Sequence, residues 1–319
     1  HALYQNKRLA KEKPANLKEA LHWYREYLSS FPRATEAPNI NYQLAELLLE
    51  NGLFAEAAQE YEKTAYVYSV FDKGDKAGFA AVYAYRQHLK QVDKSDAELV
   101  RRDAIRVSLK FAKFYPKHKK ATAVLANAVD ELYDLKDYKQ ALTAARDLIK
   151  RFPGAAEEIR RSAWIVAAHS AYELKDYSEA EKAYTEVLGL IPEGDVSRKA
   201  LIDNLVASIY KQGEAANRVK NYKRAADHFL RITTVAPTSS LRPTAEYDGA
   251  VALIKIEEWQ GAATVLTGFR KSFPKHKLQP EVTKKLAFIY REDEKFALAA
   301  VEFERIEAES TDSALRQEV

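Results

Sequence analysis

The sequence predicts an all-α protein, a right-handed α-α superhelix of about eight helix-turn-helix repeats. Two nearly identical segments indicate a sequence repeat: DLKDYKQA at 134–141 and ELKDYSEA at 173–180. In addition, an alanine is followed twelve residues later by a proline six times along the chain. Such a regular recurrence is typical of a stack of similar units. The pairs are Ala20/Pro32, Ala104/Pro116, Ala141/Pro153, Ala180/Pro192, Ala225/Pro237 and Ala262/Pro274.

Two further copies complete the series. Ala57 and Ala299 keep the alanine, but Ser69 and Thr311 stand where the proline would be. Successive alanines lie 37 to 47 residues apart, and 37 is the commonest spacing. We therefore expect a single solenoid over residues 1–319. Its approximate repeats are 1–37, 38–74, 75–121, 122–160, 161–200, 201–242, 243–279 and 280–319.

Each alanine belongs to the second helix of its unit. Apolar residues follow it at helical spacing, as at Tyr184, Val187 and Leu188, until the proline ends the helix. The alanine is expected where two helices cross closely, because a larger side chain would push them apart. Three residues before it stands an aromatic residue or leucine, which we expect to pack over the turn between the two helices; the third unit has Arg101 instead. These residues are Leu17, Phe54, Tyr138, Tyr177, Tyr222, Trp259 and Phe296.

The third and sixth units are longer than the others. The third has about ten extra residues, including 90–102, and the sixth about eight, around 211–222. Polar insertions of this size either lengthen helices or form loops, and they are candidate contact sites.

The pattern resembles the tetratricopeptide repeat, a helix-turn-helix unit of about 34 residues. The resemblance extends over essentially the whole chain and implies an α-helical solenoid that binds other proteins. In the fifth unit it is carried by Trp164, Ala167, Ala168, Tyr177, Ala180, Tyr184 and Pro192, and in the eighth by Leu286, Ala287, Tyr290, Phe296, Ala299, Phe303 and Ile306.

Most units exceed the usual repeat length by about three residues. Such stretched units look like those of bacterial envelope proteins, including lipoproteins of outer-membrane assembly and periplasmic Tol-Pal accessory proteins. This resemblance implies the periplasm, or the periplasmic face of the outer membrane, with the cytoplasm as the alternative. The absence of cysteine is compatible with an oxidising compartment. Because the sequence begins at His1 and contains no methionine, we expect a mature domain or an excised fragment.

The residue types that carry chemistry are missing or scattered. No two of the seven histidines stand three or four residues apart, and no HExxH, GxSxG or glycine-rich phosphate loop occurs. The sequence therefore predicts no enzymatic activity, no cofactor and no metal site. A net charge of +4 comes from interspersed basic and acidic residues, which does not favour nucleic acid as a partner. No apolar run is long enough to span a membrane.

Basic clusters recur near the turns that follow second helices. They either stabilise helix ends and solubility or form a basic edge for an anionic glycan, a lipid head group or an acidic peptide. The clusters are 117–120, 160–161, 271–277 and 284–285.

The resemblance implies that the first helices line a concave groove and carry most ligand contacts. Tyr133 and Tyr172 have an alternative role in packing against neighbouring helices, and His169 an alternative as an ordinary helix-face histidine. The expected groove residues are Tyr42, Glu46, Leu49, Asn127, Asp130, Tyr133, His169, Tyr172, Asn204, Ser208, Tyr247, Val251 and Ile254.

The expected function is that of a non-catalytic scaffold in bacterial cell-envelope assembly, which holds a partner protein or extended peptide in this groove. Two alternatives stay open. The first is a helical scaffold domain of a larger, glycan-processing enzyme. The second is a module that binds anionic glycan or peptidoglycan through the basic turns.

Overall fold

The computed structural model describes residues 14–68 and 71–309, which form fifteen α-helices and no strand. The predicted all-α class with helix-turn-helix repeats is confirmed. Seven of the helices are first helices of a repeat: α3 (Ala37–Glu50), α5 (Gly74–Leu89), α7 (Ala121–Asp134), α9 (Glu157–Glu173), α11 (Arg198–Arg218), α13 (Arg242–Ile254) and α15 (Gln279–Glu292). The others are second helices: α2 (Pro14–Ser30), α4 (Phe54–Tyr66), α6 (Lys94–Phe114), α8 (Tyr138–Arg151), α10 (Tyr177–Leu190), α12 (Tyr222–Val235), α14 (Trp259–Ser272) and α16 (Phe296–Glu309).

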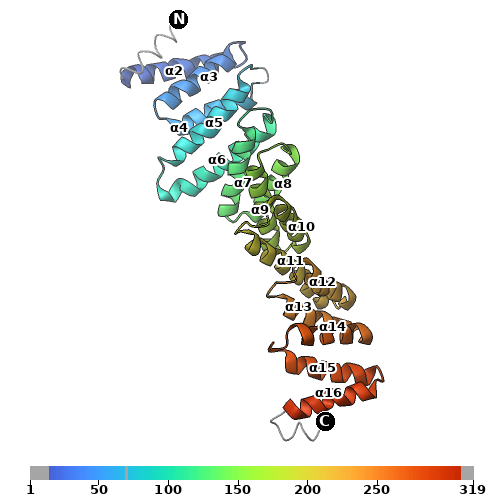
Figure 1. Ribbon diagram of the computed structural model, residues 1–319. Coiled ribbons are helices and arrows are strands. Elements are labelled where there is room, and N and C mark those ends of the chain that lie inside the picture. The colour runs from blue at the N-terminus through green and yellow to red at the C-terminus, as the bar shows by residue number, and fades with distance from the viewer. Residues whose placement is uncertain (1–13, 69–70, 310–319) are drawn as a thin grey trace. The chain divides into compact units, whose positions relative to one another are not determined.

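The chain divides into two compact units, His1–Val166 and Ala167–Val319, with the division inside α9. In unit 1 consecutive helices pack against each other from α2 to α8, and in unit 2 they do so from α10 to α16. Figure 1 shows the helices of each unit stacked in chain order. The expectation of a single solenoid over residues 1–319 stays a prediction. No helix in the described ranges is both long and apolar enough to cross a lipid bilayer.

The recurring alanines lie inside the helix packing, as a close crossing requires. All eight are at most 3% exposed, including Ala299 in the last described helix. Their small side chains let neighbouring helices approach closely. The six prolines each stand two residues beyond the end of a second helix, as Pro153 follows Arg151. Ser69 and Thr311, which replace the proline elsewhere, lie outside the described residues.

The turn between the two helices of a repeat has a left-handed residue at its centre. The next residue donates its backbone N–H to a carbonyl five positions back, as Asp176 does to Ala171 at 2.9 Å. This arrangement is a Schellman motif, which satisfies free carbonyls at the end of the first helix. The same residue then begins the second helix: the Asp176 side chain accepts a hydrogen bond from the backbone N–H of Glu179. The left-handed residues are Gly52, Lys136, Lys175, Lys220, Glu257 and Glu294.

Both insertions lengthen helices. Helix α6 in the third unit and α11 in the sixth have 21 residues each, whereas α4 and α13 have 13. The extra residues of α6 lie at its start, after Asp93, and counting back from the turn at Lys220 places those of α11 at its start as well. Of the two outcomes expected from the sequence, longer helices and projecting loops, the structure shows the first.

Helix α12 packs tightly against α11. A Cβ atom on Gly213 would lie 2.5 Å from the ring of Phe229, which is itself only 2% exposed. Gly213 is thus required by a close approach between two helices. Gly268 in α14 is also helical, but a Cβ there would have no neighbour within 4 Å.

The substitutions Gly213→Ala and Gly268→Ala should therefore change stability in opposite directions. Gly213→Ala should lower the free energy of unfolding by about 1–3 kcal/mol, because Phe229 must move to admit the methyl group. Gly268→Ala should raise the free energy of unfolding by about 1 kcal/mol, because alanine has a higher helix propensity than glycine and its methyl group meets no neighbour here. Urea unfolding followed by far-UV circular dichroism measures both. Stabilisation by Gly213→Ala would contradict the observed packing of α12 on α11.

Candidate functional site

Equivalent positions on the first helices can be found by counting back from the left-handed turn residue. Residues ten, six and three positions before it share one side of the helix. In the six repeats with such a turn, every one of these positions is exposed or half-buried. We call this surface the first-helix face. It comprises Tyr42, Glu46, Leu49, Ala126, Asp130, Tyr133, Ile165, His169, Tyr172, Tyr210, Glu214, Asn217, Tyr247, Val251, Ile254, Lys284, Phe288 and Arg291.

All the residues predicted to bind a partner belong to this face except Asn127, Asn204 and Ser208. Asn127 is an immediate neighbour of the face and is exposed on α7. The other two lie on α11, where the insertion changes the register, and are treated below.

On α3, the face combines an aromatic ring with a carboxylate. The half-buried ring of Tyr42 packs edge-on against Tyr61, with 5.6 Å between centroids, and lies 5.7 Å from the ring of Phe71. Burial and the nearby charge of Glu46 raise the pKa of Tyr42, so its hydroxyl stays protonated. Leu49, one turn further along, packs against the core of unit 1. The side chains of Tyr42 and Leu49 are therefore packed against their neighbours.

On α7, the face is more polar. Asp130 is exposed and accepts a hydrogen bond from the Ser162 hydroxyl of α9 at 3.2 Å. Burial of part of the carboxyl group raises the pKa of Asp130, and Asp134 and Glu131 raise it further. Tyr133 is half-buried with its ring 5.6 Å from that of Tyr138. Tyr133 therefore packs over the turn and presents only part of its ring.

On α9, the two predicted residues both make internal contacts. His169 Nδ1 lies 2.8 Å from the hydroxyl of Tyr184, a side chain that is 1% exposed. Tyr172 packs edge-on against Tyr177 at 5.3 Å, which repeats the pairing of Tyr133 with Tyr138 in the preceding repeat. His169 is thus engaged with the core of unit 2.

On α11, the structure corrects one of the two predicted positions. Ser208 is fully buried and donates its hydroxyl to the backbone oxygen of Asn204, so it cannot contact a partner on this surface. Asn204 is half-buried. Counted back from the turn at Lys220, both residues precede the three face positions of α11. The residues that occupy the first-helix face are Tyr210, Glu214 and Asn217.

A polar contact joins the faces of α11 and α13. The Tyr210 hydroxyl donates to Asp248, and burial raises the pKa of Asp248 although this hydrogen bond opposes the rise. Tyr247 and Ile254 are half-buried and pack against the core of unit 2, and Val251 is half-buried between them on α13. In unit 1, Arg86 of α5 similarly binds Glu131 of α7 at 2.9 Å.

Two exposed aromatic residues on first helices were missed from the sequence. Phe288 on α15 is 37% exposed and lies six residues before Glu294, the position that Asp130 and His169 occupy in their repeats. Counting back from the turn would have found it. Tyr83 on α5 is 47% exposed, but the described part of that repeat has no left-handed turn residue to count from.

Arginine and glutamate side chains form ion pairs between successive second helices. Arg106 of α6 binds both carboxylate oxygens of Glu62 on α4, at 2.8 and 3.0 Å. In unit 2, Arg231 of α12 holds Glu181 of α10 in the same way, and Arg270 of α14 binds Glu302 of α16 at 2.6 and 2.8 Å. These bidentate contacts connect successive second helices.

The pKa values of two of these carboxylates show the strength of the pairing. Burial raises the pKa of Glu62, but the hydrogen bond and charge of Arg106, together with Lys110, outweigh burial and hold it below its ordinary value. Glu181 behaves likewise, with Arg231 and Gln212 as its partners. Both carboxylates remain charged in the folded protein and are occupied with structural contacts.

Residues 127–195 match the family model for the tetratricopeptide repeat. This segment of the chain carries tetratricopeptide repeats. The matched segment contains most of α7 and the whole of α8, α9 and α10, in which the alanine, turn and proline register is clearest. The resemblance predicted from the sequence is therefore confirmed.

Solved tetratricopeptide repeat structures share low sequence identity with the chain. YrrB, described as a tetratricopeptide repeat protein with an unusual peptide-binding site, is 14% identical, with 65% of this chain and 95% of YrrB covered and a TM-score of 0.35. A protein from Parabacteroides merdae is 13% identical, with 88% of this chain and 96% of that protein covered and a TM-score of 0.34. The C-terminal part of a protein from Cytophaga hutchinsonii is 13% identical, with 86% of this chain and 98% of that structure covered and a TM-score of 0.36. A comparison with curated protein sequences found no match.

Of the cavities that open on the described helices, three are lined by none of the predicted partner-binding residues. One of about 790 Å³ lies between the second helices α6 and α8, and one of about 420 Å³ lies at the end of α6. The third lies at the end of α11. No group of three or more histidine or acidic side chains within the described ranges is placed to hold a metal ion.

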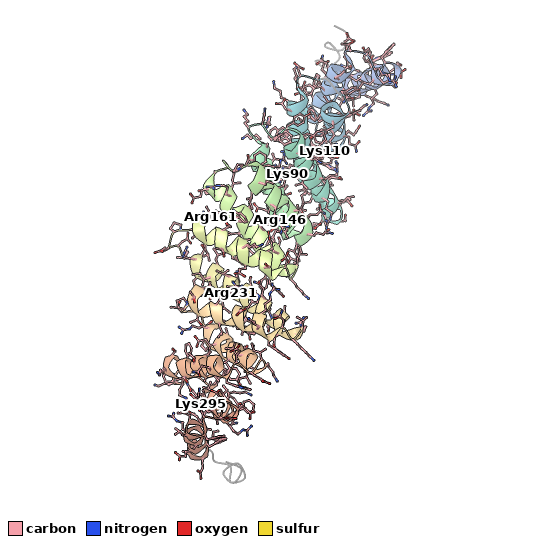
Figure 2. All side chains as sticks on the ribbon, turned by 90° about the vertical axis from the view of Figure 1, so that its right-hand side faces the viewer. Lys90, Lys110, Arg146, Arg161, Arg231 and Lys295 are labelled. Carbon is pink, nitrogen blue, oxygen red and sulfur yellow. The ribbon has the colours of Figure 1, made fainter. Side chains whose placement is uncertain are left out.

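Lysine and arginine side chains are spread over both units (Figure 2). Of the basic clusters seen in the sequence, Lys117, Lys119 and Lys120 are exposed, as are Lys271, Lys275 and Lys277.

Stability should fall with pH below neutrality in part through His169. Burial lowers the pKa of His169 below the ordinary value of 6.5, so the unfolded chain takes up a proton first as the pH drops. The stabilisation by neutral His169 is present above pH 6.5 and is lost as the pH falls through the folded-state pKa. His169→Gln keeps an acceptor for Tyr184 but does not titrate. The variant should therefore lose less stability than the wild type between about pH 7.5 and about pH 5.5.

Urea midpoints at the two pH values measure this difference. His22→Gln, at an exposed position on α2, serves as the control and should follow the wild-type profile. Equal losses in His169→Gln and in the wild type would contradict the assignment.

Proposed function

We propose that the protein is a scaffold that binds a partner protein through its first-helix face. The observation that carries this proposal is the difference between the two sides of the repeats. The first-helix face keeps its side chains exposed or half-buried in six repeats, whereas the second helices bind one another through ion pairs such as Glu62 with Arg106. Binding of protein or peptide partners is the general role of tetratricopeptide repeats.

The composition of the first-helix face suits protein recognition. Tyrosine and phenylalanine rings offer large contact areas at low cost in side-chain entropy. Here the rings are held in place before binding, since Tyr42 packs against Tyr61 and Tyr172 against Tyr177. Such preorganised side chains reduce the entropy lost on association. Carboxylates beside the rings, such as Asp130, add polar contacts that fix the register of a bound segment.

The proposed setting is cell-envelope assembly in a bacterium, on the periplasmic side of the outer membrane. Two features support it: repeats mostly longer than the usual length of about 34 residues, and the absence of cysteine. Fractionation of the source cells with an antibody against the protein tests this setting. The protein is expected with the periplasmic or outer-membrane fraction, and recovery in the cytosolic fraction would contradict the proposal.

Removing exposed rings from the first helices should weaken partner binding. The double variant Tyr83→Ser and Phe288→Ser removes one ring from each unit. We expect it to recover at least about tenfold less partner from a cell extract than the immobilised wild-type chain, because aromatic side chains dominate such interfaces. Quantitative mass spectrometry of the captured proteins measures the ratio.

The matched control removes rings that are at least as exposed but lie on second helices. Phe114→Ser and Phe296→Ser change side chains that are 57% and 66% exposed. The control should capture the same proteins as the wild type, and circular dichroism should show full helicity for both double variants. Loss of partners in the control and retention in the first-helix variant would refute the assignment.

A further inference from the structure

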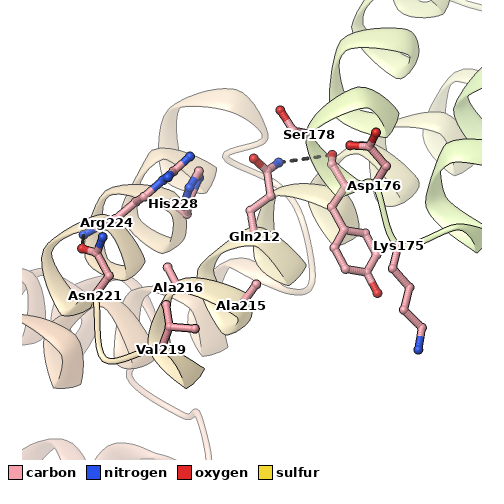
Figure 3. Close-up of a pocket in the computed structure, with 11 residues that line it drawn as sticks. Lys175, Asp176, Ser178, Gln212, Ala215, Ala216, Val219, Asn221, Arg224 and His228 are labelled. Carbon is pink, nitrogen blue, oxygen red and sulfur yellow. Dashed lines mark hydrogen bonds between the residues drawn. The ribbon is translucent and has the colours of Figure 1, made fainter.

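A cavity of about 360 Å³ lies in unit 2, between the starts of the second helices α10 and α12. Asp176, Tyr177 and Ser178 line one side at the start of α10, and Asn221, Arg224 and His228 line the other at the start of α12. Figure 3 shows the two groups facing each other across the end of α11. The first-helix face does not contribute to this cavity.

The end of α11 forms the floor of the cavity. This floor consists of Ala215, Ala216 and Val219, all of which come after the fourteenth residue of α11. First helices such as α3, α7 and α15 have 14 residues in all. Gln212, three residues before this floor, donates to the backbone oxygen of Tyr177, the first residue of α10. The end of α11 therefore reaches beyond the start of α10, and the cavity lies at this extension.

Internal hydrogen bonds leave hydrogen-bond donors free on the α12 side. The Oδ1 atom of Asn221 accepts the backbone N–H of Arg224, which leaves the amide NH₂ as the free end of this side chain. Arg231 donates to Nδ1 of His228 at 3.0 Å, so the neutral ring carries its proton on Nε2. The guanidinium of Arg224 adds further donors. A cavity with this donor set favours a ligand that accepts hydrogen bonds.

The charges around the cavity agree with an anionic ligand. Arg231 is neutralised by Glu181, and Asp176 accepts the backbone N–H of Glu179 as the cap of α10. By contrast, the side chains of Arg224 and Lys175 make no ion pair with any residue of the described ranges. Lys175 extends away from Arg224 at the outer end of the cavity (Figure 3). Arg224 is thus the cation best placed to meet a carboxylate.

We propose that this cavity binds an acidic side chain on an extended segment of a partner protein. The carboxylate would accept hydrogen bonds from Arg224, with Asn221 and His228 as further donors, and the methylene groups would lie over Ala215 and Val219. Arginine forms bidentate hydrogen bonds with carboxylates, which gives both affinity and orientation. This site lies apart from the first-helix face and does not depend on the function proposed for it.

A synthetic peptide of Gly, Ser and Glu, labelled with fluorescein, serves as the probe, and its counterpart with Gln in place of Glu as the reference. Fluorescence polarisation with the full chain should show at least about tenfold tighter binding of the Glu peptide. Two variants test the cavity itself. Arg224→Gln removes the cation and Ala215→Phe fills the space above the floor, and each should weaken binding of the Glu peptide by about tenfold or more.

Lys223→Gln is the matched control, because it removes a positive charge next to Arg224 from an exposed side chain that does not line the cavity. It should change the affinity by less than about twofold. Equal losses in Lys223→Gln and Arg224→Gln would show attraction by bulk charge and overturn the proposal. Failure of the wild-type chain to prefer the Glu peptide would overturn it as well.

Free glutarate distinguishes a protein segment from a small carboxylate. It should displace the peptide weakly, because it lacks the flanking main chain, and displacement as effective as that by unlabelled Glu peptide would overturn the proposal. Phe288→Ser, on the first-helix face, should leave binding of the Glu peptide unchanged. The experiments therefore distinguish a failure of the proposal for this cavity from a failure of the proposal for the first-helix face.

Discussion

The close crossing of helices at one alanine per repeat is the constraint on which the rest of the structure depends. At Ala141 and Ala180 the side chain has no exposed surface, because a neighbouring helix lies directly against it. Each crossing buries an apolar stripe that a single helix pair could not bury alone, so every repeat needs the next. This requirement explains why the alanine persists where the proline does not, as in the second repeat, whose Ala57 is fully buried.

The left-handed turn gives the packed helices a repeated surface. It joins the two helices in a constant geometry, so residues at a fixed distance before it, such as Asp130 and Phe288, occupy equivalent places in different repeats. The second helices are bound to one another by arginine and glutamate, as at Arg231 and Glu181. The cavity at the end of α11 is the third element. The proposed recognition surface lies on the first helices, and these ion pairs lie between second helices.

Much of this architecture was predictable because its signals are local or periodic. The alanine and proline spacing predicted the second helices, and most predicted groove residues lie on one face. Ser208 was misplaced because a single sequence does not show at which end of a helix an insertion lies. The pair Arg231 and Glu181 was not predicted, because the two residues are 50 apart and their meeting depends on how α10 and α12 pack. The cavity beside α11 depends on the same packing and could likewise not be predicted from the sequence.

The central claim, that alanine at the helix crossing controls the stacking of the repeats, is tested most directly by enlarging that residue. Ala141→Leu changes a side chain with no exposed surface, whereas Ala123→Leu makes the same change at an exposed position on α7. In urea unfolding followed by circular dichroism, Ala141→Leu should lower the free energy of unfolding by about 1–3 kcal/mol. Ala123→Leu should stay within about 0.5 kcal/mol of the wild type. Equal stability of the two variants would contradict the account.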